Sequence, residues 1–132
     1  MKMTDERRSM TAALVYYARI GTGGCKTPFQ IYKRIEGACG KNRELARDVW
    51  AVHECLQVLR SISDFDTVKT VKEIYFKPFS KSPNRIPMKN ELTNRIQRFA
   101  LENYIDERTV YRRLLKARKI WKYIRFAGED EE

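Results

Sequence analysis

Apolar residues recur every three or four positions along most of the chain, which is the spacing of one face of an α-helix. Alternation of apolar and polar residues, which would indicate a strand, never persists. The pattern therefore predicts an all-α fold with six helices. The first helix is expected at residues 7–20. The second begins at residue 28 and lasts until Gly37 and Gly40 interrupt the pattern, and the third continues for about five turns from residue 42. The last three are expected at 64–76, 88–102 and 107–126.

The clearest apolar stripe lies between Leu45 and Leu59, where successive members are four, three, four and three positions apart. This heptad-like spacing is typical of a core seam inside a helical bundle or of a contact between two copies of a chain. Because the stripe is only two heptads long, packing within one chain is the preferred interpretation, and a homodimer remains an alternative.

Proline and charge divide the sequence into parts. Residues 77–87 contain three prolines and two serines, a composition that a regular helix does not accommodate. We expect residues 1–63 to form an N-terminal helical bundle, with oligomerisation as one role. We expect residues 64–126 to form a second unit that includes 77–87 as a loop, followed by an acidic tail at 127–132.

The formal net charge of +10 indicates a polyanionic partner. Residues 67–132 hold 16 basic and 9 acidic residues, whereas residues 1–66 hold 11 and 8, so the partner is expected to bind the C-terminal half. No apolar run approaches the roughly 20 residues of a membrane-spanning helix, and the first ten residues lack the pattern of a signal peptide. The sequence predicts a cytoplasmic protein with no membrane partner.

Residues 99–114, FALENYIDERTVYRRL, have the pattern of a helix-turn-helix unit that binds DNA. The small residue Ala100 lies ten positions before Val110, which lets the second helix cross close to the first. Ile105 is expected to fill the turn, and Asp106 to cap the second helix by accepting a hydrogen bond from a free backbone N–H group. Tyr104 stands where the turn usually has glycine, so the turn must be left-handed or rebuilt at a cost of about 1 kcal/mol.

A helical projection of residues 107–126 separates an apolar face from a basic one. The apolar face, which we expect in the core, contains Val110, Leu114, Ala117, Trp121 and Ile124. The opposite face has no acidic residue and contains Arg108, Arg112, Lys116, Lys119 and Tyr123. Such a face is either simply solvated or binds a polyanion, and the charge asymmetry favours the second interpretation.

In that interpretation the second helix enters the major groove, where arginine can bond guanine through two hydrogen bonds. The residues expected to read bases are Arg108, Thr109, Arg112 and Arg113. The residues expected to hold backbone phosphates are Arg95, Arg98, Lys116 and Lys119.

The stretch 67–125 resembles the fourth region of bacterial sigma factors, with VKTVKEIYF as a first helix and ERTVYRRLLKARKIW as the recognition helix. It is also similar to phage-encoded late-gene regulators of the RinA and ArpU type. The resemblance implies a sequence-specific transcriptional regulator that binds double-stranded DNA, of phage or prophage origin, with RNA polymerase as a further partner. The alternative is a DNA-packaging protein similar to the small subunit of a terminase.

Other chemistry has little support in the sequence. The segment GTGGCKT at 21–27 lacks the glycine spacing of a phosphate-binding loop. The thiols of Cys25, Cys39 and Cys55 and the imidazole of His53 include no pair at the usual spacing of zinc ligands. We interpret the cysteines as reduced core residues and His53 as a surface residue. We expect no metal, no cofactor and no enzymatic activity.

Overall fold

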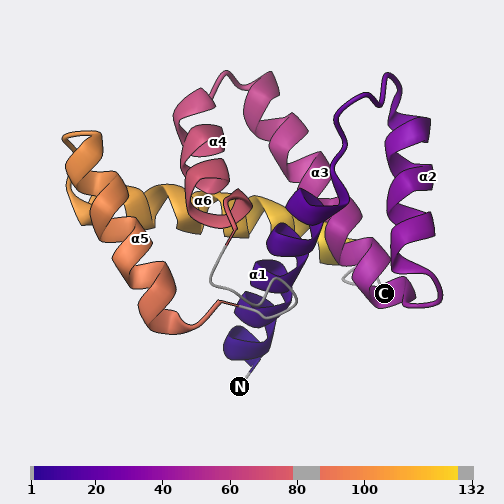
Figure 1. Cartoon of the computed structure of the whole chain (residues 1–132), viewed down its shortest axis with the longest axis horizontal. Coiled ribbons are helices and arrows are strands. Elements are labelled where there is room, and N and C mark those ends of the chain that lie inside the picture. Colours follow the sequence, from indigo (N-terminus) through magenta and orange to yellow (C-terminus); the bar gives the residue numbers. More distant parts are fainter. Residues whose placement is uncertain (1, 79–86, 128–132) are drawn as a thin grey trace.

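The computed structural model describes residues 2–78 and 87–127, with side chains from residue 8 onward. Its helices are α1 (Lys2–Ile20), α2 (Pro28–Cys39), α3 (Arg43–Ser61), α4 (Phe65–Val71), a π-helical turn η1 (Lys72–Phe76), α5 (Lys89–Glu102) and α6 (Glu107–Phe126). Within these ranges there is no strand, which confirms the prediction of an all-α fold. Figure 1 shows α6 along the long axis of the molecule, with α5 near one end and α3 crossing it towards the other.

Side-chain caps begin the helices where the sequence contains capping residues. Thr27 caps α2 and forms a capping box with Gln30, and Asn42 accepts a hydrogen bond from the first turn of α3. The predicted interruption at Gly37 is wrong, because α2 continues to Cys39. It ends only at Gly40, whose φ of +59° is a conformation that glycine adopts without strain.

The helix predicted at 64–76 is present as α4 followed directly by η1. Asp64 caps it by accepting from the backbone N–H of Thr67. The helical path ends at Lys77, which is extended (φ −81°, ψ 143°) because the ring of Pro78 disfavours a helical residue before it. Most of the predicted loop at 77–87, and the acidic tail beyond residue 127, lie outside the described residues.

The first core lies between α1, α3 and α6. Its buried members include Met10, Ala13, Leu14, Tyr17, Val49, Val52, Cys55, Leu56, Leu59, Ala117 and Trp121. The heptad-like stripe of α3 therefore packs within the chain, against α1 on one side and α6 on the other.

The second core lies between η1, α5 and α6 and consists of Ile74, Ile96, Phe99, Ala100 and Val110. Helix α6 contributes to both cores, because Val110 belongs to the second and Ala117 and Trp121 to the first. The units 1–63 and 64–126 thus share a helix that each needs for its apolar interior.

Polar contacts fasten the C-terminal half of α6 to α3. The indole N–H of Trp121 donates to the backbone oxygen of Asp48 at 3.0 Å. The guanidinium of Arg125, whose side chain is only 5% exposed, donates to the carboxylates of Asp48 at 2.6 Å and Glu44 at 2.5 Å. Burial raises the pKa of Asp48 in spite of the opposing effect of Arg125.

The predictions of surface exposure for His53 and of burial for one cysteine are wrong. His53 is buried rather than on the surface, with its Nδ1 3.0 Å from the hydroxyl oxygen of Tyr17 and its ring 5.1 Å from that of Trp50. Cys25 is only half-buried, whereas Cys39 and Cys55 are buried as expected, and burial raises the pKa of Cys55 to about 12. His53 is misjudged because its face of α3 is covered by Tyr17, 36 residues away.

The structure also bears on the metal and membrane predictions. Among the described residues, no three histidine, cysteine or carboxylate side chains gather where they could hold a metal ion. In the same ranges, no helix combines the length and the apolar character needed to cross a membrane.

We expect Trp121→Ala to destabilise the protein by about 3 to 5 kcal/mol, because it empties a fully buried site and removes the bond to Asp48. The matched change Tyr123→Ala, on the exposed face of α6, should change stability by less than about 0.5 kcal/mol. Urea unfolding followed by circular dichroism measures both values. Equal losses in the two variants would contradict the shared role of α6.

We also expect the free energy of unfolding to fall as the pH drops through 6.5, the ordinary pKa of histidine. Burial, followed by the charge of Arg60, lowers the pKa of His53, so the unfolded chain takes up its proton first. The loss continues until the pH reaches the lower value of the folded state. His53 is the only histidine, so His53→Gln should remove this component between about pH 7.5 and about pH 5.5. The same pH dependence in both proteins would argue against it.

Candidate nucleic-acid interface

The turn between α5 and α6 has the geometry that the sequence predicts. Tyr104 takes the left-handed conformation with φ +56°, and its side chain is 96% exposed. The backbone N–H of Ile105 donates to the backbone oxygen of Ala100 at 3.1 Å, and the N–H of Tyr104 donates to the oxygen of Leu101 at 3.4 Å. These two hydrogen bonds form a Schellman motif. This motif satisfies the last carbonyls of α5 and turns the chain sharply into α6.

Side chains on both sides of the turn hold it in place. Asp106 accepts from the backbone N–H of Thr109 at 2.8 Å, as predicted. Hydrogen bonds from the side chain and backbone of Thr109 hold the pKa of Asp106 below its ordinary value, so the cap stays ionised. Asn103, where an apolar residue is usual, donates to the oxygen of Phe99 at 2.8 Å and accepts from Lys69 of α4 at 3.2 Å.

The two faces of α6 are arranged as the helical projection predicts. Val110, Ala117 and Trp121 are buried, and Leu114 and Ile124 are half-buried. The opposite face is exposed and contains Arg108, Arg112, Lys116, Lys119 and Tyr123.

Three of these basic residues are outside any ion pair that the structure describes, although the charges of Arg108 and Arg112 help to lower the pKa of the Asp106 carboxyl at the start of the helix. Among the described residues, Arg108, Arg112 and Lys119 form no ion pair, and no carboxylate lies on their face of α6. Arg108 and Arg112 lie one turn apart at the start of the helix, and Lys119 lies about two turns further on. They form a basic face that we call the α6 basic face.

The structure uses two of the other predicted residues to join α6 to α4. Arg113 donates to the hydroxyl of Thr70 at 3.3 Å, and its guanidinium lies 3.9 Å from Asp66. Lys116 pairs with Asp64 at 2.5 Å, and this contact is the main reason that the pKa of Asp64 lies below its ordinary value. Both side chains therefore connect α6 to the start of α4.

Arg95 and Arg98, predicted to hold phosphates, differ in their surroundings. Arg95 donates to the carbonyl oxygens of Ile74 at 3.0 Å, Lys77 at 2.8 Å and Pro78 at 2.8 Å, and so closes the end of η1. Arg98 is exposed on α5. Arg95 thus satisfies backbone groups that the end of a helix leaves open, and Arg98 faces solvent.

The sequence interpretation missed two residues that lie beside the α6 basic face. Tyr111 is 47% exposed and Leu115 is 39% exposed. In the helical projection both lie between the buried face and Arg108, so their positions could have identified them. They add an apolar margin beside the two arginines.

No protein-family model, curated protein or solved structure matches this chain. The function proposed below is accordingly supported by the geometry and charge of α6 and by the resemblance described above.

Proposed function

We propose that this chain is a sequence-specific transcriptional regulator that binds double-stranded DNA with α6 in the major groove. The observation that carries the proposal is the α6 basic face, which is exposed and unpaired among the described residues. Grouped cations of this kind repel each other in the free protein, and DNA phosphates relieve that repulsion.

The surroundings of α6 support a helix-turn-helix assignment. Helix α5, the Schellman turn and α6 follow one another with a connection of residues 103–106, and η1 covers their shared core. In known units of this kind the second helix projects its exposed face into the major groove while the remaining helices support it. The buried contact between Ala100 and Val110 is consistent with such close crossing.

The residues of α6 then take different roles. Arg108 and Arg112, near the N-terminal end, are the proposed base readers, with Thr109 at the edge of the same turn. Tyr111 and Leu115 offer apolar surface to thymine methyl groups. Lys119 lies further along the helix.

Phosphate contacts are proposed for Lys119 and for Arg98 of α5. Arg113, Lys116 and Arg95 are proposed to act indirectly, because their side chains already hold α6 and η1 in position. The regulatory role and RNA polymerase as a further partner are supported by the resemblance of residues 67–125 to sigma-factor region 4. The phage or prophage origin is supported by the similarity to phage-encoded late-gene regulators.

Binding to duplex DNA is expected to weaken steeply with salt, because each neutralised phosphate releases counterions. If about six phosphates are neutralised, log K should fall against log salt with a slope of about −5. Fluorescence anisotropy of labelled duplexes at increasing salt concentration measures the slope. A flat dependence would exclude a polyanionic partner.

The roles of Arg112 and Lys119 can be separated by mutation. Arg112→Ala should weaken binding to the preferred sequence by about 1 to 3 kcal/mol and reduce discrimination at one base position. Lys119→Ala should weaken all sequences about equally and reduce the salt slope by about one unit. The preferred duplex is selected from a random pool, and binding is measured on that duplex and on one of scrambled sequence.

Lys33→Ala is the matched control, since it removes an exposed charge on α2, far along the chain from α6. It should leave sequence preference unchanged. If Arg112→Ala retains its helical circular dichroism and its full preference for the selected site, the α6 basic face does not read DNA.

A further inference from the structure

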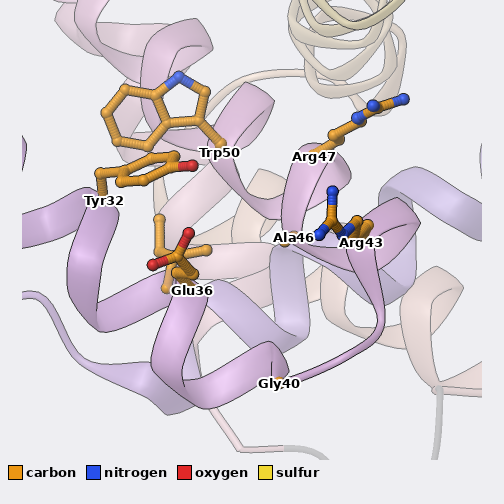
Figure 2. A pocket seen from close by; sticks show the side chains of 8 residues that line it. Tyr32, Glu36, Gly40, Arg43, Ala46, Arg47 and Trp50 are labelled. Atoms are coloured by element: carbon orange, nitrogen blue, oxygen red, sulfur yellow. The ribbon is translucent and has the colours of Figure 1, made fainter.

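A second candidate site lies between α2 and α3, on elements that the proposed DNA contacts do not use. The two helices border a cleft of about 480 Å³, within the range of about 300 to 1,000 Å³ that is usual for small-molecule sites. Figure 2 shows the rings of Tyr32 and Trp50 on one side of this cleft and Arg43 on the other, with Glu36 below the rings; Arg47 also lines the cleft, but its side chain extends away from the rings. The cleft thus combines one apolar end with one cationic end.

The aromatic end is formed by Tyr32 of α2 and Trp50 of α3. Their ring centroids are 5.5 Å apart and the rings are nearly perpendicular, at 87°. Trp50 is supported from the core by His53, whose ring centroid lies 5.1 Å away, while Tyr32 is 45% exposed. A pair of held rings with one side open to solvent offers a stacking surface to a planar ligand.

The cationic end is formed by Arg43 and Arg47, one turn apart at the start of α3. Arg43 forms no ion pair with any described residue. Arg47 lies 3.7 Å from Glu44, but that carboxylate is also held by Arg125 at 2.5 Å. Both guanidinium groups therefore have donors left for an oxyanion, which they can bind through paired hydrogen bonds.

Glu36 supplies an acceptor between the two ends. Its carboxylate lies 3.5 Å from the ammonium of Lys33, which offsets its charge and leaves further lone pairs open. An ionised carboxylate accepts from adjacent N–H groups, and a purine ring such as guanine presents two such donors side by side. Trp50 follows Arg43 by seven residues, or about 10 Å along the axis of α3, so the aromatic and cationic ends of the cleft are about two helical turns apart.

We propose that this cleft binds a small ligand that joins an aromatic ring with N–H donors to an anionic group, of the class of a nucleoside monophosphate. The ring packs on Tyr32 and Trp50, Glu36 accepts from its edge, and Arg43 binds the phosphate, with Arg47 adding positive charge at the same end of the cleft. The proposal is independent of DNA binding, because none of the residues that line the cleft belongs to α5 or α6.

The test is a titration of the full chain with guanosine 5′-monophosphate, followed by calorimetry and by quenching of tryptophan fluorescence. Trp121 is fully buried in the first core, so a quenching signal comes from Trp50. Guanosine and inorganic phosphate, each of which has only half of the proposed contacts, should bind at least about tenfold more weakly than the nucleotide.

The variant Arg43→Gln with Arg47→Gln, and separately Tyr32→Leu, should each weaken nucleotide binding at least about tenfold while the helical circular dichroism is retained. Arg112→Gln is the matched control and should bind the nucleotide as the wild type does, because it changes only the α6 basic face.

Absence of nucleotide binding at about 1 mM, or equal binding of inorganic phosphate, would overturn the proposal. So would a loss in Arg112→Gln as large as that in the cleft variants, because the nucleotide would then be bound at the α6 basic face. None of these results depends on whether the chain recognises a DNA sequence.

Discussion

The burial of α6 in two cores is the constraint on which the rest of the structure depends. Val110 and Trp121, eleven residues apart, are both fully buried, one among η1 and α5 and the other against α3. A 20-residue helix is about 30 Å long, so α6 extends through most of a molecule of this size. With both ends packed on the same side, the rotation of α6 is determined, and Arg108, Arg112 and Lys119 face outward.

The charges of α6 follow the same division. Arg113 and Lys116, which lie towards α4, and Arg125, which lies towards α3, are paired with carboxylates of those helices. Arg108 and Arg112 lie away from both neighbours and form no such pair among the described residues. The paired cations help to orient α6, whereas the unpaired ones produce a positive potential outside the molecule. The two groups lie at different angles around the axis of the same helix.

Periodicity and capping residues predicted the helical stretches, the faces of α6 and the turn, because these depend on neighbours a few positions away. The prediction was wrong at the start of α1, which begins at Lys2 rather than at residue 7, and at Gly37, which lies within α2. The left-handed Tyr104 and the cap at Asp106 follow from local rules of this kind. Side-chain partners did not follow, because they depend on tertiary packing. Arg113 meets Thr70 across 43 residues and Lys116 meets Asp64 across 52, and the burial of His53 and the cleft beside Trp50 likewise require the packed helices.

The shared helix also bears on how this protein could have been assembled in evolution. Here a cut near residue 63 would leave the partners of Ala117 and Trp121 on the other fragment and expose the seam of α3 to water. The two halves therefore depend on one another, because a substitution on α3 opposite Trp121 changes the packing of α6.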